Sequence, residues 1–190
     1  MLVGSKSIKK MRAVYFERQI RRRCVLHSLN NLLGMKLVTV EDLNATAITI
    51  AKKYAYDSIE RRLRSGKVTL HSAEAEFKKT YENYLGQVVS SDGFWSTEVA
   101  IRWLTERGWS VKHLPSLPNA PKLNYASGDF LLSVVVDGIS HAVVVKRGIL
   151  FDSLLQSPIF LDNDVNNGFP SNYKILAVYK VQQEKDIIMF

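Results

Sequence analysis

The chain has 190 residues, of which 46% are hydrophobic and 23% are charged, and its formal net charge is +8. This length and composition favour one domain with a buried core, and they exclude a disordered chain or a membrane span of about 18 apolar residues. The single cysteine excludes an intrachain disulfide and a cysteine-rich zinc site, and it fits a reducing compartment. We expect no metal, no cofactor and no membrane association.

The positive charge is concentrated in the first part of the chain. Residues 1–70 contain 15 Lys and Arg against 5 Asp and Glu, whereas residues 71–190 contain 11 against 13. A basic half is compatible with nucleic acid, with an acidic partner or with a solvated surface. No zinc finger, RNP-type aromatic motif or heptad array supports nucleic-acid binding, so a solvated surface is favoured. Residues 1–12 lack the apolar core of a signal peptide and are predicted to form a basic tail.

The first predicted helix covers residues 24–33. Its apolar side chains recur at helical spacing and form one stripe, made of Val25, Leu29, Leu32 and Leu33. Gly34 follows, as is typical of a helix end. The polar side chains of this helix lie together on another face and are Cys24, His27, Ser28 and Asn31.

Residues 39–86 are predicted to form a helical region. Thr39 and Asp42 have the spacing of a capping box, which predicts a helix that runs to about residue 55. A basic stretch over residues 57–67 then ends in a turn, and a second helix lies within 72–85, before Gly86. A further helix is predicted over 97–107, capped by Ser96 or Thr97 and closed by Gly108.

From residue 109 onward the pattern changes from helix to strand. Apolar, β-branched runs at 109–114, 129–136, 140–146, 148–155 and 173–181 are predicted to be strands. Three prolines within 115–122 predict a surface loop, and Asp137-Gly138 predicts a hairpin turn. Helices followed by an antiparallel meander give the α+β class.

Cys24 is a candidate nucleophile because it begins a helix directly after Arg21–Arg23. The positive end of a helix and nearby cations both favour the reactive thiolate, although a lone cysteine can also be buried and inert. A nucleophilic cysteine needs an imidazole and an acceptor that orients it. His141 follows the hairpin turn, and Asp152 on the next strand can pair with it across the strands, whereas His27 is better placed for local bonding.

Gln19 precedes Cys24 by five residues. A glutamine amide just upstream of a nucleophile can donate to the oxyanion, beside the backbone N–H of the nucleophile itself. A surface glutamine without a role is the alternative.

The stretch ERQIRRRCVLHSLNNLLG resembles the opening of the Josephin domain, which reads glutamine, four residues, cysteine, two residues, histidine, two residues and Asn-Asn-Leu-Leu. DGFWSTEVAIRWLTERGW is similar to the Gly-aromatic-aromatic-Ser helix of that family. SHAVVVKRGILFDSLL is similar to its histidine strand and the following Asn/Asp-Ser strand. The resemblance covers residues 13 to 160, in the same order.

The resemblance implies a papain-like cysteine protease fold of Josephin type that acts as a deubiquitinase on ubiquitin and ubiquitinated proteins. It implies Cys24 as nucleophile, His141 as general base and acid, Asp152 as the group that orients His141, and Gln19 in the oxyanion hole. It suggests substrate contacts at Phe94, Trp95 and Ala142. A helical arm is expected within about 55–86, beside the substrate channel. The expected catalytic domain is 13–182, between the tails 1–12 and 183–190.

The sequence departs from the family at several positions. Ala142 stands where the family often has tryptophan, and Ser28 stands where it usually has a second cysteine. Arg21–Arg23 would repel the basic tail of ubiquitin unless carboxylates receive it, and the candidates are Glu17, Asp92 and Glu98.

Two alternatives therefore stay open: a hydrolase of a ubiquitin-like modifier or another acyl substrate, and a catalytically weak module that binds ubiquitin or nucleic acid. We expect a monomer inside a cell, in the cytoplasm or nucleus, or in a host cell if the source is a parasite or virus.

Overall fold

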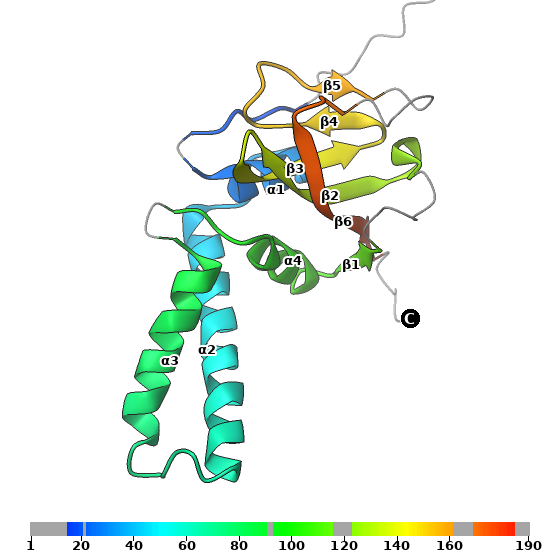
Figure 1. Cartoon of the computed structure of the whole chain (residues 1–190). Coiled ribbons are helices and arrows are strands. Elements are labelled where there is room, and N and C mark those ends of the chain that lie inside the picture. Colours follow the sequence, from blue (N-terminus) through cyan, green and yellow to red (C-terminus); the bar gives the residue numbers. More distant parts are fainter. Residues whose placement is uncertain (1–14, 21, 91–92, 116–122, 162–168, 185–190) are drawn as a thin grey trace, which may run out of the picture.

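The computed structural model describes residues 15–20, 22–90, 93–115, 123–161 and 169–184. Within them four α-helices come first in the chain and six strands of one sheet follow (Figure 1), which confirms the predicted α+β class. The predicted tail 1–12 and residues 116–122 of the proline-rich loop lie outside the described residues, as do residues 185–190 of the predicted C-terminal tail. None of the described helices has the length and apolar character that crossing a membrane requires.

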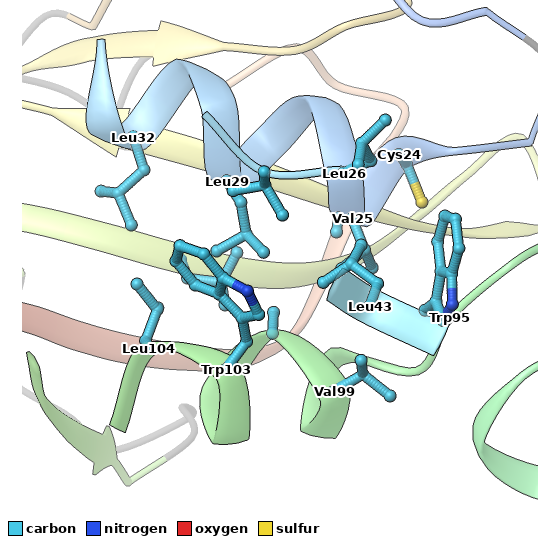
Figure 2. Packing of buried hydrophobic residues seen from close by; sticks show 14 of the residues in the cluster. Cys24, Val25, Leu26, Leu29, Leu32, Leu43, Trp95, Val99, Trp103 and Leu104 are labelled. Carbon is cyan, nitrogen blue, oxygen red and sulfur yellow. The ribbon is translucent and has the colours of Figure 1, made fainter. Parts of the chain in front are cut away.

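Helix α1 (Cys24–Leu33) is the first element, with the predicted bounds. It ends at Gly34, whose φ of 76° is in the left-handed region and whose N–H donates to Asn30 O at 2.9 Å. Its apolar stripe packs against helix α4 (Thr97–Thr105), which begins after Ser96. Figure 2 shows this packing, with Trp103 and Leu104 of α4 facing α1 and Cys24 at the end of the cluster where Trp95 lies.

Helices α2 (Val40–Arg64) and α3 (Ala73–Val88) form a helical arm that extends away from the sheet (Figure 1) and begins well before residue 55, the predicted start of the arm. Helix α2 begins with the predicted capping box, in which Thr39 and Asp42 exchange side-chain and backbone hydrogen bonds. It does not end near residue 55, however. The basic stretch continues it to Arg64, because that stretch consists of good helix formers and is supported by the exposed i,i+4 pair Glu60–Arg64.

The second difference in the arm concerns Gly86, which lies inside α3 and does not end it. A Cβ at Gly86 would meet no other atom within 4 Å, so the glycine sits on an open face of the helix. The helix continues to Val88, which is 5% exposed and belongs to the core. Burial of this side chain outweighs the weak helix propensity of one glycine.

The sheet is antiparallel throughout and has the strand order β1-β6-β2-β3-β4-β5. The strands are β1 (Trp109–Leu114), β2 (Asp129–Val136), β3 (Ile139–Lys146), β4 (Ile149–Phe151), β5 (Ile159–Phe160) and β6 (Tyr173–Gln183). The predicted meander is correct for β2, β3 and β4, including the Asp137-Gly138 hairpin. The strand predicted over 148–155 ends at Phe151, β5 was not predicted, and the meander is wrong for the whole sheet. Strand β6 inserts between β1 and β2, a pairing of distant segments that local patterns do not encode.

Alternation along the strands gives the sheet two buried faces. Leu131, Val144 and Phe151 pack with α1 and α4, whereas Leu132 and Val143 pack in a second cluster on the other face. Strand β6 changes this alternation by a bulge, since Ala177 pairs with Ser133 but Ile175 pairs with Val134. Leu176 is the extra residue, and it moves every earlier side chain of β6 to the opposite face.

Candidate active site

Cys24 opens α1 at the wall of a cavity of about 770 Å³. The residue lines this cavity although it is only 2% exposed. The cavity lies between the start of α1, the loop that follows the arm and the β2–β3 hairpin. Its lining is Gln19, Arg22, Cys24, Ser90, Phe94, Val136, Asp137, Gly138, Ile139, Ser140, His141 and Leu154.

His141 lines this cavity and is in contact with Asp152. His141 is the third residue of β3, and Asp152 directly follows β4, the next strand of the hairpin. The Nε2–H of His141 donates to Asp152 Oδ1 at 2.7 Å, and both side chains are buried. Cys24 lies close enough to His141 to raise the pKa of its imidazole. Because Nε2 is used by Asp152, Nδ1 is the nitrogen that faces the sulfur.

Asp152 receives two further donors. The Leu154 N–H donates to Oδ1 at 2.8 Å, and the Tyr173 hydroxyl donates to Oδ2 in a short contact. Tyr173 reaches Asp152 because of the β6 bulge at Leu176, which turns the first residues of β6 to the sheet face that carries Leu150 and Asp152. The buried carboxylate is therefore satisfied on both oxygens, which a buried charge requires.

These contacts set the protonation states of the pair. Burial lowers the pKa of His141, but its hydrogen bonds with Asp152 and Cys24 and their negative charges outweigh burial and raise the pKa to about 9. Burial raises the pKa of Asp152, but the hydrogen bond and charge of His141, with the Tyr173 and Leu154 donors, hold it below its ordinary value. An imidazolium held by a carboxylate next to a thiol is the arrangement that activates a cysteine nucleophile.

Gln19 lines the cavity and is held by Ser153, the residue after Asp152. The Gln19 N–H donates to Ser153 O at 2.8 Å, and the Ser153 hydroxyl donates to Gln19 Oε1 at 3.2 Å. Because Oε1 accepts from Ser153, Nε2 is the donor end of this amide. The structure thus brings Gln19, Cys24 and His141 to one cavity.

The three predicted substrate contacts have different positions. Phe94 lines the cavity, whereas the described lining does not include Trp95 or Ala142. Trp95 is 1% exposed and its indole N–H donates to Asn44 Oδ1 at 3.1 Å. Ala142 is buried in the same core cluster. These two residues can affect the shape of the cavity only by packing against the residues that line it.

The carboxylates expected to receive a basic tail also lie elsewhere. Glu17 contacts His27 and Tyr15, Glu98 accepts a hydrogen bond from Tyr54, and Asp92 is outside the described residues. Asp137, at the β2–β3 turn, is the described carboxylate in the cavity lining. Of Arg21–Arg23, Arg22 lines the cavity, and Arg21 is not among the described residues.

Ser28 links the cysteine helix to the histidine strand. Its buried hydroxyl donates to Ala142 O at 2.7 Å, one residue after His141. We expect Ser28→Ala to lower the free energy of unfolding by about 1–3 kcal/mol, because a buried carbonyl loses a hydrogen-bond donor. Ser28→Cys, which restores the residue usual at this position in Josephin domains and keeps a weak donor, should lose less. Urea titration measures both variants, and an Ala variant as stable as the wild type would contradict this role.

Tyr173 is expected to stabilise the fold through the charge on Asp152. A carboxyl group with a lowered pKa contributes stability above its unfolded pKa and loses it as the pH falls through the folded value. Tyr173→Phe removes one donor to the carboxylate, so the midpoint of acid unfolding should move to higher pH. At pH 7 the loss should be about 1.5–3 kcal/mol. Tyr179→Phe, on the same strand but on the other face, is the matched control and should leave the acid midpoint unchanged.

Sequence reasoning missed Tyr173 and Ser153 as parts of this site. Tyr173 is 21 residues from Asp152 and gave no local signal. Ser153 belongs to the Asp-Ser pair of the resemblance but received no role. The described residues contain no cluster of three or more His, Cys, Asp or Glu side chains placed to hold a metal ion.

Comparison with known protein families identifies a match. The family model of the Josephin domain matches residues 19–165, a range that begins at Gln19 and includes Cys24, His141 and Asp152. No curated protein gives a significant match to the chain. The matched range covers most of the chain and contains the whole arrangement of thiol, imidazole and carboxylate. The chain therefore belongs to the Josephin family, a family of ubiquitin-related cysteine proteases whose domains bind ubiquitin.

Proposed function

We propose that this protein is a deubiquitinase that hydrolyses the peptide or isopeptide bond after the C-terminal glycine of ubiquitin. The observation that carries the proposal is the joint presence of Cys24, His141 and Gln19 in one cavity, with His141 held by Asp152. The family supplies the substrate class, and the site supplies the chemistry.

In the first half of the reaction, the Cys24 thiolate attacks the carbonyl carbon of the glycine, and the negative charge moves to the carbonyl oxygen. The Gln19 side-chain amide and the Cys24 backbone N–H donate to this oxyanion. The Cys24 N–H is available because the first N–H groups of a helix have no acceptor within the helix. Donors placed before the charge develops stabilise the transition state strongly.

His141 handles the protons in both halves. As imidazolium it protonates the leaving lysine amine when the C–N bond breaks, which leaves a thioester between ubiquitin and Cys24. As neutral base it then takes a proton from the water that attacks the thioester. When the thioester breaks, Cys24 leaves as a thiolate beside the His141 imidazolium, and the starting ion pair is restored. Asp152 keeps Nε2 protonated, so Nδ1 is the nitrogen that exchanges protons at the sulfur.

The cavity also fits the tail of ubiquitin, which reads Leu-Arg-Leu-Arg-Gly-Gly. Cys24 and His141 are only 2% and 5% exposed, so residues without side chains are required next to the sulfur. Ile139 and Leu154 line the cavity and are 65% and 52% exposed, as expected for apolar contacts that await leucine. Asp137 offers a carboxylate to one arginine.

The test is reaction with ubiquitin that carries a thiol-reactive electrophile in place of its C-terminal carboxylate. We expect one adduct of one ubiquitin per chain, and no adduct with Cys24→Ala, which removes the single thiol of the chain. Intact-protein mass spectrometry measures both. A folded wild-type protein that forms no adduct would overturn the proposal.

A ubiquitin-like modifier is the second candidate substrate, and Arg22 in the cavity wall is the observation that favours it. A cationic lining suits a tail with fewer arginines better than the tail of ubiquitin. The same electrophile on a panel of ubiquitin-like proteins discriminates the two. Faster labelling by another modifier than by ubiquitin would change the substrate but keep the chemistry.

A further inference from the structure

His27 is a buried histidine that the proposed reaction does not use. It lies one turn after Cys24 on α1 and is 2% exposed. Its Nε2 accepts the Ile20 N–H at 3.1 Å, and its Nδ1 lies 3.1 Å from Glu17 Oε1. Since Nε2 is an acceptor, the ring is neutral and carries its proton on Nδ1. A ring in this state, with Nε2 accepting from Ile20 and a protonated Nδ1 near Glu17, cannot serve Cys24 as base.

The two contacts of His27 lie on either side of Gln19. Glu17 is two residues before Gln19, and Ile20 is the residue after it. The segment 15–20 belongs to no helix or strand, so contacts with other parts of the chain must hold it. Asn31, one turn after His27, accepts the Glu17 N–H at 2.7 Å and donates to Glu17 O at 3.2 Å. Helix α1 therefore holds this segment on both sides of Gln19, at Glu17 and at Ile20.

Ser153 holds Gln19 from the strand side of the site, opposite to the contacts that come from helix α1. It binds both the backbone N–H and the side-chain Oε1 of Gln19, and it directly follows Asp152. Gln19 is thus held between the helix that begins with the nucleophile and the segment that carries the carboxylate. The contacts described for Gln19 come from Ser153, next to the carboxylate of Asp152.

We infer that His27 is a positioning residue for Gln19, acting as a neutral hydrogen-bond acceptor for the Ile20 N–H so that the Gln19 amide meets the oxyanion. The inference rests on the proposed function in that it assigns the oxyanion to Gln19. Burial lowers the pKa of His27 despite the opposing charge of Glu17, and this favours the neutral ring that the contact requires. The charged groups that act on the ring are Glu17 and Arg23.

The experiment separates oxyanion stabilisation from reactivity of the thiol. Hydrolysis of ubiquitin bearing a fluorogenic amide at its C-terminal glycine forms an oxyanion, whereas alkylation of Cys24 by iodoacetamide displaces iodide at a saturated carbon and forms none. We expect His27→Leu to lower kcat by about 10- to 100-fold, below the loss from deleting an oxyanion donor outright. KM and the alkylation rate should change less than about twofold, because binding and the Cys24–His141 pair stay intact.

Two further variants sharpen the result. His27→Gln places an amide oxygen near the position of Nε2 and should recover most of kcat. Combining His27→Leu with Gln19→Ala should lose little beyond Gln19→Ala alone, because both changes remove the same donor. Equal losses in hydrolysis and alkylation, or a double variant whose losses multiply in full, would overturn the inference.

Hydrogen exchange of the backbone amides tests the contact without any turnover. The Ile20 N–H should be protected in the wild type and should exchange faster in His27→Leu, while amides of β2 and β3 keep their protection. If the wild type fails to hydrolyse ubiquitin, the proposed function fails but this measurement still decides the position of the loop. Unchanged exchange at Ile20 in His27→Leu would contradict the role of His27 in either case.

Discussion

Replacing His141 with alanine is expected to lower kcat/KM for the fluorogenic ubiquitin amide by about two to four orders of magnitude. The variant loses the group that protonates the leaving amine and activates the water. It also leaves Asp152, which is fully buried, without its cationic partner. Steady-state kinetics measure the loss, and circular dichroism shows whether the variant is folded. His113→Ala, at an exposed histidine on β1, is the matched control and should keep wild-type rates.

The pH profile of the wild type gives an independent measurement of the same group. The acylation step needs the His141 imidazolium, and the pKa of this histidine is raised to about 9. Activity should therefore persist through neutral pH and fall as the pH rises through about 9. Asp152→Asn keeps an acceptor for Nε2 but removes the negative charge, so the upper limb should move to lower pH. An upper limb that stays in place in this variant would contradict the assigned pair.

Replacing Gln19 with alanine is the second large effect, with an expected fall in kcat of about 100- to 1000-fold. KM and the rate of Cys24 alkylation by iodoacetamide should stay close to those of the wild type, since the donor acts only when the oxyanion forms. Gln19→Glu should lose more than alanine, because it places a negative charge beside a developing one.

Gln182→Ala, on β6 and outside the cavity lining, controls for loss of a glutamine in general. An alkylation rate that falls together with kcat would show that Gln19 supports the thiol and not the oxyanion.

Local signals in the sequence were enough for the elements that carry the nucleophile. The stripe on α1, Gly34 at its end and the capping box of α2 are encoded within a few residues, and each lies where predicted. Predictions that depended on burial were less accurate. Helix α3 passes through Gly86 because Val88 is buried, and no local pattern shows which residues of the arm will meet the core.

The candidate site shows the same division. The contact between His141 and Asp152 follows from a short hairpin, so turn position and strand length predict it. The contact of Tyr173 with Asp152 depends on a strand that inserts between two others and on one extra residue, Leu176, that reverses its alternation. Pairing over such distances is decided by the whole sheet, and a single sequence carries no separate signal for it.

The position of β6 in the sheet also bears on the order in which the chain folds during its synthesis. Strands β2 to β5 leave the ribosome before β6. However, β6 pairs with one edge of β2, and it carries Tyr173, which contacts Asp152. A nascent chain that already contains Cys24, His141 and Asp152 therefore lacks both a complete sheet and a fixed carboxylate. Translation through residues 173–183 is therefore what completes the sheet and brings Tyr173 to the Asp152 carboxylate.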